Sequence, residues 1–374
     1  MKIATIDVYQ HDLPYPGGTY RLSGGRTYTS FDSTVVKVTA DDGIVGWGES
    51  TPFGANYIAA HALGVRAGIA ELAPALLGRD PRRVERTYDL MDRTLAGHNH
   101  AKTPIDVACW DLFGKSVGLP VCELLGGSTG TPMPTISSIH AGDPEDMRRR
   151  VAEHRDAGFR GHSVKIGALD SEGGPVLDAA RIEACLADRR PGEFYIVDAN
   201  GGMLPEMVLR LFNVLPRGLD FVLEAPCATW QETISVRERS PYPIVVDELG
   251  QTDADIAFAA ANRVADGAGL KISKAGGLTP ARRHRDILRS AGMTISVQET
   301  AGSAIAYAAI LQLGATVPEQ YLRCVLDTAA TYGAGAGTLH LSSRDGGVLP
   351  DPLPGLGVDV DEEILGDPIA SWSA

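Results

Sequence analysis

Residues 162–165 read HSVK, a short run that ends in the charged residue Lys165. Four similar runs follow at intervals of one (β/α) unit, and their last residues are Asp198, Glu224, Asp247 and Lys271. Each interval has room for a strand, a loop and a helix. In a (β/α) barrel the carboxyl ends of the strands meet at one mouth. The pattern therefore predicts that these five charged side chains face one cavity.

The same alternation extends through the chain from Met133 onward. β-like runs there alternate with amphipathic helical stretches. The predicted strands cover residues 133–138, 162–166, 194–198, 221–224, 244–247, 269–272, 294–298 and 322–326. This is the number of strands that a closed (β/α) barrel requires.

The first part of the chain has a different pattern. Strands are predicted over residues 3–11, 33–40 and 44–49, and Ala/Leu-rich helical segments follow over 59–125. Residues 14–26 are dense in Pro and Gly, which predicts a flexible loop. A sheet followed by helices makes a compact α+β module. We predict an α+β module (1–130), a TIM-like barrel of eight strands with intervening helices (131–345) and a C-terminal segment (346–374) that packs on the module.

Composition excludes several classes of partner. The chain has 374 residues, of which 44% are hydrophobic, so it can bury a large core. Its formal charge of -13 and lack of a basic stripe argue against nucleic acid. No apolar stretch reaches the ~18 residues that cross a bilayer. The N-terminal residues lack a secretion signal, and the five scattered cysteines suit free thiols. We expect a cytoplasmic protein that binds no membrane.

The three acidic residues of the series predict a metal site. A single acidic residue at a strand end is usually solvated or caps a helix, but three in consecutive units between two lysines favour ligands. Carboxylates suit a hard cation such as Mg²⁺, and Mn²⁺ is the alternative. Asp247 ends its run and is preferred as ligand over Glu248. Glu248 is expected to support the ligands by hydrogen bonding.

The two lysines predict proton transfer at carbon. A substrate carboxylate can bind the cation, which stabilises the charge formed when a proton leaves the adjacent carbon. A lysine can act as the base if burial and the cation lower its pKa from ~10.4 towards ~7–8. Lys165 and Lys271 are expected to face the substrate from opposite sides. Lys274 is expected to be structural or at the surface.

Short motifs spread over the chain support this interpretation. They are DVACWD at 106–111, LLGG at 124–127, KIG at 165–167, DAN at 198–200, EAPC at 224–227, DE at 247–248 and KISKAGG at 271–277. Together they resemble the enolase superfamily, specifically its mandelate racemase/muconate lactonizing enzyme branch. The resemblance covers essentially the whole chain and implies a (β/α)7β barrel whose capping domain is formed by both chain ends.

The resemblance also implies details of the site. Loops 15–27 and 49–57 would close over the site and select a small carboxylate substrate, and Asn200 would support the metal ligands. Relatives are often symmetric oligomers, so a homo-oligomer is expected. The family commonly has a lysine two residues before the catalytic one. Ser163 stands there in this chain, which leaves the pKa of Lys165 open.

The two loops resemble those of enzymes that act on proline derivatives. Residues 161–165 (GHSVK) resemble the dehydratases among them, which implies dehydration of a hydroxyproline such as cis-3-hydroxy-L-proline. The alternative is a racemase or epimerase of proline betaines, amino acids or dipeptides, and both reactions begin with the same proton abstraction. Tyr20, Phe53 and Tyr57 are expected to cover the methylenes of the ring.

Two further acidic residues are candidates for substrate binding. Glu299 would pair with a substrate ammonium or, alternatively, hydrogen-bond to a catalytic lysine. Asp327 matches half of the Asp-x-Asp motif of dipeptide epimerases, with Val325 at the other position. The absence of Trp over residues 323–328 weakens the betaine hypothesis. A non-catalytic, metal-stabilised binding protein is the alternative of another class, against which the two lysines argue.

Overall fold

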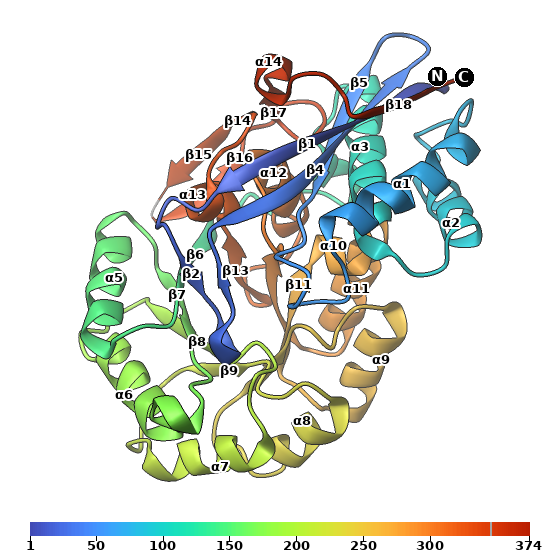
Figure 1. The fold of residues 1–374 in the computed structure, drawn as a ribbon. Coiled ribbons are helices and arrows are strands. Elements are labelled where there is room, and N and C mark those ends of the chain that lie inside the picture. Colours follow the sequence, from blue (N-terminus) through green and yellow to red (C-terminus); the bar gives the residue numbers. More distant parts are fainter. Residues whose placement is uncertain (345) are drawn as a thin grey trace.

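Eight parallel strands close into a barrel in the computed structural model, which describes residues 1–344 and 346–374 (Figure 1). They are β6 (Met133–Ile139), β7 (Gly161–Lys165), β8 (Phe194–Asp198), β9 (Val222–Glu224), β10 (Ile244–Val246), β11 (Gly267–Lys271), β12 (Thr294–Gln298) and β13 (Leu322–Leu326). β13 pairs with β6 and closes the barrel. The predicted (β/α)7β fold with its capping sheet is confirmed.

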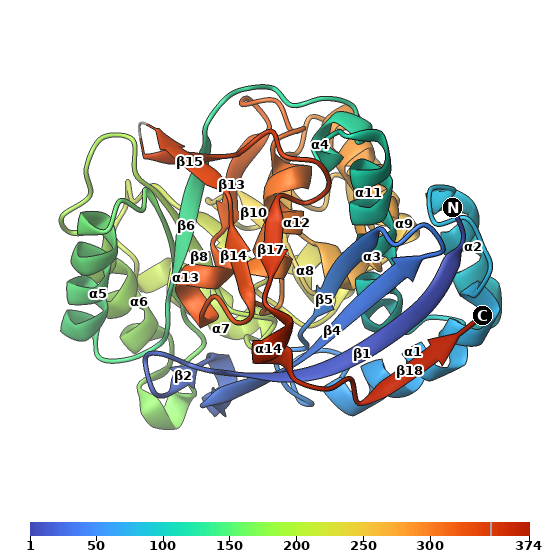
Figure 2. The same ribbon diagram turned by 90° about the horizontal axis from the view of Figure 1, so that it is seen from above.

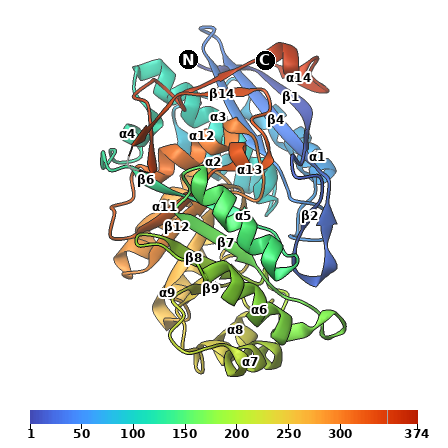
Figure 3. The same ribbon diagram turned by 90° about the vertical axis from the view of Figure 1, so that its left-hand side faces the viewer.

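Seven helices connect consecutive barrel strands in the described residues, and α5 to α7 cover the side next to β6–β8 (Figure 3). They are α5 (Pro144–Asp156), α6 (Gly174–Leu186), α7 (Pro205–Val214), α8 (Trp230–Arg237), α9 (Asp253–Asn262), α11 (Leu278–Ser290) and α12 (Ala304–Gly314). A short helix, α10 (Ile272–Ala275), directly follows β11. Over the described residues, no helix combines the length and apolar character of a membrane span.

An antiparallel sheet beside the barrel is built from both ends of the chain (Figure 2). Its order is β18 (Ala370–Ser373), β1 (Ile3–Pro14), β4 (Ser30–Ala40) and β5 (Val45–Ser50). Helices α1 (Ala62–Leu76), α2 (Val84–Thr94), α3 (Asn99–Val117) and α4 (Val121–Leu124) follow. The last strand therefore completes the N-terminal sheet.

The segment after the barrel contacts both parts of the fold. It contains α13 (Thr328–Tyr332), β14 (Gly337–Leu339), β15 (Leu341–Arg344), β16 (Gly347–Pro350), β17 (Val358–Val360) and α14 (Glu362–Leu365). β16 pairs with β6 of the barrel, whereas β18 pairs with β1. The predicted boundary at residue 345 lies outside the described residues, and the three-part division stays a prediction.

The breaker-rich stretch 14–26 is more regular than predicted. Tyr20–Arg21 (β2) pairs with Thr27–Tyr28 (β3), and the 3-10 turn η1 (Ser23–Gly25) joins them. Gly24 and Gly25 have φ values of 65° and 72°, in the region where glycine is favoured. The glycines thus form a defined hairpin tip. This tip contacts the barrel, since Gly24 N donates to Gly167 O.

The sheet packs closely on helix α3 because β5 carries glycines where the two elements meet. A Cβ built at Gly48 would lie 2.0 Å from Pro104 O, and one built at Gly46 would lie 2.1 Å from Ala108 O. Backbone atoms of a buried helix cannot move away from such a contact without disturbing the core. The two glycines therefore fix the distance between sheet and helix.

We expect Gly48→Ala to lower the free energy of unfolding by about 1–3 kcal/mol, because overpacking displaces backbone. Urea unfolding of the two proteins measures the difference. Gly142→Ala is the matched control, since its Cβ would meet the Arg150 side chain at an ordinary 3.4 Å. An equal loss in both variants would show that close packing on α3 is not the cause.

Candidate active site

The five predicted charged residues lie together at the carboxyl ends of consecutive strands. Lys165 ends β7, Asp198 ends β8, Glu224 ends β9 and Lys271 ends β11, while Asp247 directly follows β10. The parallel register pairs Lys165 with Asp198 and Asp198 with Glu224. All five side chains are buried. The structure therefore brings this set to one end of the barrel.

Ion pairs connect the lysines to the two outer carboxylates. Lys165 Nζ donates to Asp198 Oδ2. Lys271 Nζ donates to Asp247 Oδ2 at 2.5 Å, and Lys274 Nζ donates to Asp247 Oδ1 at 2.6 Å. Lys274 was expected to be structural or at the surface. It is buried, which fits the structural role and not the surface position.

The adjacent carboxylates raise the pKa values of both bracketing lysines. Burial disfavours the ammonium of Lys165, but the charge of Asp198 outweighs it, and the pKa of Lys165 lies above its ordinary value. Burial likewise opposes the charge of Lys271, and Asp247 with Glu248 raises its pKa. The lowering inferred from the sequence assumes a bound cation; without that charge the adjacent carboxylates outweigh burial at both lysines.

Glu224 differs from the two carboxylates beside it. Among the described residues no lysine pairs with it, and Gln298 Nε2 is its hydrogen-bond donor at 3.4 Å. Burial raises the pKa of Glu224 well above its ordinary value, and the charges of Asp198 and Asp247 raise it further. A positive charge placed among the three carboxylates would relieve this repulsion.

The donor set fits a hard divalent cation in its chemistry. Within residues 1–344 and 346–374, no group of three His, Cys, Asp or Glu side chains is arranged to hold a metal ion. The outer carboxylates instead bind ammonium groups. Glu224 Oε1 and Asp247 Cβ nevertheless approach the same glycine, because a Cβ at Gly269 would lie 2.8 and 3.5 Å from them. Three carboxylates with an uncompensated member suit Mg²⁺.

Asn200 and Glu248 lie beside the carboxylates, as expected for supporting residues. Asn200 Nδ2 donates to Asp198 Oδ2 at 2.9 Å and to Glu248 Oε1 at 3.2 Å. Asn200 adopts a left-handed conformation with φ 46°, which Asn tolerates better than most residues. Asn200 Oδ1 and Glu248 Oε2 are buried and accept no hydrogen bond within the described part of the chain. These lone pairs remain available to a bound group.

A small chamber of about 30 Å³ is lined by both bracketing lysines. Its walls include the three predicted aromatic residues and the position of the missing lysine. The lining residues are Tyr20, Leu22, Phe53, Tyr57, Ile136, Ser138, Ser163, Lys165, Asn200, Lys271, Gln298, Glu299, Thr300, Leu326 and Tyr332. Every one except Tyr57 is buried. The volume suits about one water molecule, so a substrate requires the two loops to move.

An aromatic cluster holds the two loops on the barrel. The ring of Phe53 lies 5.1 Å from that of Tyr20 and 4.6 Å from that of Phe31, measured between centroids. Tyr332 from α13 packs against the same group, 5.0 Å from Phe31. Tyr20 also hydrogen-bonds to Ser138 of β6. Loops 15–27 and 49–57 are thus packed against each other above the chamber.

The two candidate substrate-binding carboxylates have different positions. Glu299 lines the chamber, where Oε1 accepts from Ser273 N at 2.9 Å and burial raises its pKa to about 7. It forms no hydrogen bond to a lysine in the described residues. Asp327 caps α13 by accepting from Ala330 N at 2.8 Å and is absent from the described chamber lining. The structure does not bring Asp327 to the other candidates.

Sequence reasoning missed several residues of the chamber wall, among them Gln298 and Tyr332. Gln298 ends β12 in register with Lys271, so the rule that selected the five charged residues also applied to it, but a neutral side chain was not sought. Tyr332 lies on α13, outside any strand end. No local sequence signal indicates that it reaches the chamber.

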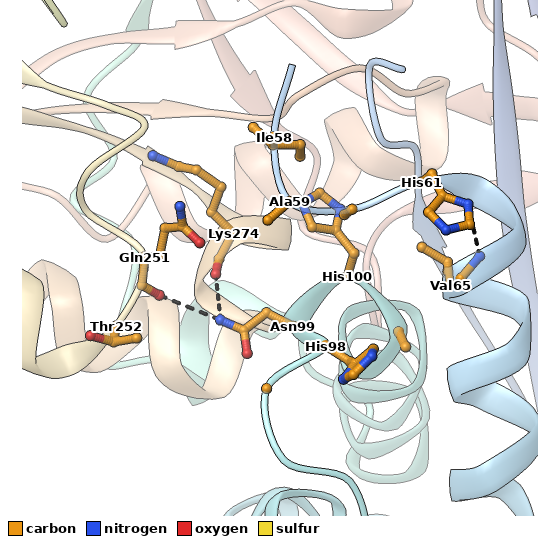
Figure 4. Close-up of a pocket in the computed structure, with 14 residues that line it drawn as sticks. Ile58, Ala59, His61, Val65, His98, Asn99, His100, Gln251, Thr252 and Lys274 are labelled. Carbon is orange, nitrogen blue, oxygen red and sulfur yellow. Dashed lines mark hydrogen bonds between the residues drawn. The ribbon is translucent and has the colours of Figure 1, made fainter. Parts of the chain in front are cut away.

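A larger cavity of about 460 Å³ lies behind loop 49–57 (Figure 4). Residues 58–61, 97–101 and 251–252 surround it together with Lys274. Asn99 Nδ2 donates to the carbonyl oxygen of Lys274 at 2.7 Å, which joins the start of α3 to α10. The cavity therefore borders the same helix whose lysine binds Asp247.

Comparison with known families agrees with the geometry. Residues 24–126 match the mandelate racemase/muconate lactonizing enzyme N-terminal domain, and residues 146–364 match the enolase C-terminal domain-like family. The second match alone covers more than half of the chain. The chain belongs to the mandelate racemase/muconate lactonizing enzyme branch of the enolase superfamily.

Three relatives place the chain more closely. A cis-3-hydroxy-L-proline dehydratase from Roseibium aggregatum is 35% identical over 100% of both chains. An N-succinyl-L-Arg/Lys racemase from Bacillus cereus is 26% identical over 98% of this chain and 97% of its own. A crystal structure from Roseovarius nubinhibens ISM, assigned to mandelate racemase/muconate lactonizing enzymes and complexed with magnesium, is 52% identical over 100% of both chains, with a TM-score of 0.98.

The family assignment settles the class of protein. The chain is an enolase-superfamily enzyme, a lyase or a racemase/epimerase, since such enzymes are its curated relatives. The alternative of a non-catalytic, metal-stabilised binding protein is therefore set aside.

Proposed function

We propose that this enzyme uses Mg²⁺ and lysine to abstract the α-proton of a hydroxyproline such as cis-3-hydroxy-L-proline, and that dehydration follows. One observation carries the proposal: two buried lysines flank three buried carboxylates at one barrel end, under an aromatic cover. The 35% identity to a cis-3-hydroxy-L-proline dehydratase supports the substrate class.

Asp198, Glu224 and Asp247 would hold the Mg²⁺, with Asn200 and Glu248 orienting them by hydrogen bonds. When bound, the cation supplies positive charge that stabilises the enediolate formed on the substrate carboxylate. Mn²⁺ is proposed as a substitute with the same oxygen preference. Neutralised carboxylates would no longer raise the pKa of the lysines, and burial would then favour the neutral amine that a base requires.

Lys165 and Lys271 would divide the two faces of the substrate α-carbon. One amine takes the Cα proton as the Cα–H bond breaks. In dehydration the Cβ–O bond then breaks, a Cα–Cβ double bond forms, and the hydroxyl leaves as water with a proton from a lysine ammonium. In the alternative, epimerisation, the opposite lysine returns a proton to Cα. Both outcomes use the same proton abstraction.

The chamber wall supports a compact apolar ring as substrate. Tyr20, Phe53 and Tyr57 would cover ring methylenes. Glu299 is proposed as the partner of the ring ammonium, and Asp327, which caps α13 and is absent from the described chamber lining, stays a prediction. We also propose that the enzyme is a homo-oligomer, which light scattering of the purified protein would measure.

Incubation with cis-3-hydroxy-L-proline in D2O with Mg²⁺ tests the function. We expect mass spectrometry to show loss of one water from the substrate. Cα deuteration with the hydroxyl retained would favour the epimerase instead. Absence of both reactions with every hydroxyproline, proline betaine and dipeptide offered would reject the proposed substrate class.

A further inference from the structure

Tyr57 connects a loop above the chamber to one of the two lysines. Its hydroxyl donates to Glu248 Oε1 at 2.6 Å and accepts from Lys271 Nζ at 2.8 Å. Both distances are those of good hydrogen bonds. Tyr57 is also the one partly exposed residue in the described lining of the chamber. The residue thus reaches from the protein surface to the amine.

Both loops meet at the ring of Tyr57. The guanidinium of Arg26, in the hairpin loop, lies 5.5 Å from the ring centroid. Arg26 is itself held, because Nε donates to Ser23 O at 2.9 Å and a terminal nitrogen donates to Asn200 O at 3.3 Å. The ring centroid of Phe53, which like Tyr57 belongs to loop 49–57, lies 5.6 Å from that of Tyr57. Tyr57 therefore keeps this position only while both loops are closed.

Lys271 depends on few contacts to hold its amine. Its hydrogen-bond partners in the described residues are Asp247 Oδ2 and Tyr57 Oη. Asp247 also binds Lys274 and is a proposed metal ligand, so it is shared among several cationic groups. A lysine side chain carries about 2 kcal/mol of rotamer entropy. A second fixed partner is therefore needed to hold Nζ in one place.

Tyr57 suits this task because a phenol both donates and accepts hydrogen bonds. Its bond to Glu248 fixes the hydroxyl, and the uncharged oxygen does not compete with a cation for the carboxylates. Lys165 lacks this arrangement, since its hydrogen-bond partner in the described residues is Asp198. The two lysines therefore differ in how their amines are held.

We propose that Tyr57 is a positioning residue for Lys271, which sets the amine against the substrate only when loops 15–27 and 49–57 are closed. Closure of the loops and placement of one base are then a single event. The role rests on the proton abstraction proposed above, and it affects one face of the substrate α-carbon.

Tyr57→Phe tests the role because it removes the hydroxyl and keeps the ring. Tyr28→Phe is the matched control: its hydroxyl donates to Asn56 Oδ1 at 2.7 Å and joins the same two loops away from Lys271. Crystal structures of both Mg²⁺-loaded variants give the first readout. We expect Lys271 Nζ to be displaced or spread over several rotamers in Tyr57→Phe alone, with Lys165 unchanged. An unmoved Nζ in Tyr57→Phe would overturn the proposal.

Deuterium exchange at Cα of D-proline and L-proline gives the second readout, since these probes have no hydroxyl to lose. We expect Tyr57→Phe to slow exchange of the enantiomer that Lys271→Ala silences by at least ~10-fold, and to leave the other enantiomer within about 3-fold. Equal slowing of both enantiomers would show a general role in closure and overturn the positioning role. If the wild-type enzyme exchanges neither proline, the displacement of Lys271 alone decides the role of Tyr57, and the incubation with hydroxyprolines still decides the proposed function.

Discussion

Lys165→Ala and Lys271→Ala are each expected to lower kcat by about 10³-fold or more, because a positioned general base contributes roughly 10²–10⁴-fold. Each amine is buried at the chamber and lies on its own side of the carboxylates. Substrate binding is expected to change much less, since the proposed ligands of the substrate carboxylate remain. Steady-state kinetics with the hydroxyproline substrate measures kcat and KM separately.

Lys165→Ala and Lys271→Ala are expected to lose proton exchange on opposite faces of the substrate α-carbon. If each lysine serves one face of the α-carbon, each single variant loses exchange of one enantiomer of proline and keeps the other. Lys37→Ala is the control. Lys37 lies on β4 of the capping sheet, far from the chamber in the fold, and pairs with Glu362 of α14. Retention of exchange at both faces by both single variants would contradict the two-base arrangement.

Stability measurements separate a catalytic loss from a folding loss. Lys165→Ala leaves the buried carboxylate of Asp198 without its ammonium partner, and breaking a buried pair in this way is destabilising. We therefore expect the metal-free variant to melt below the wild type. Mg²⁺ should restore much of the difference, since it would neutralise the same carboxylate. If kcat stays low after Mg²⁺ has restored the melting temperature, the loss is due to the missing amine of Lys165 and not to unfolding.

The strands of the barrel were predictable because their signals are local. The runs that end at Asp198, Gln298 and Leu326 begin and end in the structure where the sequence indicates. A buried parallel strand is a short apolar run, and a charged residue at its end marks the mouth. The positions of the proposed ligands and bases could therefore be predicted before any contact was known.

Contacts between distant segments could not be predicted in the same way. Tyr57 was expected to cover a ring, but its bonds to Glu248 and Lys271 join residues about 200 positions apart in sequence. One alternative for Glu299 was a hydrogen bond to a catalytic lysine, whereas its carboxylate accepts from Ser273 in the described residues. No periodicity records such pairs, because they depend on how loops fold over the barrel.

The electrostatic balance at the site was also beyond the sequence. Residue types indicated that burial together with a cation could lower the pKa of a lysine, but not that Asp198 would outweigh burial at Lys165 without the cation. The outcome depends on an oxygen-to-nitrogen distance that a pattern of residues does not specify. Glu224 has no lysine partner among the described residues, so a change of its charge is the most informative test of this balance.

Glu224→Gln is expected to abolish turnover and yet stabilise the metal-free protein. The pKa of Glu224 lies well above its ordinary value through burial and the charges of Asp198 and Asp247. A carboxyl with a raised folded-state pKa binds its proton more tightly when folded, so its contribution to stability falls as pH rises above the ordinary value. The amide removes this penalty, and one pKa unit corresponds to about 1.4 kcal/mol.

Urea unfolding in EDTA between pH 4 and pH 8 measures the effect. We expect the variant to be more stable than the wild type by about 1 kcal/mol or more at pH 7, and the difference to shrink towards pH 4, where the carboxyl is protonated in the unfolded chain as well. Adding Mg²⁺ should raise the melting temperature of the wild type strongly and that of the variant little, because the amide brings no charge to the cation. Glu206→Gln, at an exposed position on α7, should stay within about 0.5 kcal/mol throughout. The interpretation would be contradicted if the metal-free variant were less stable than the wild type. It would also be contradicted if Mg²⁺ stabilised the variant as much as the wild type, because Glu224 would then not be a carboxylate that needs a cation.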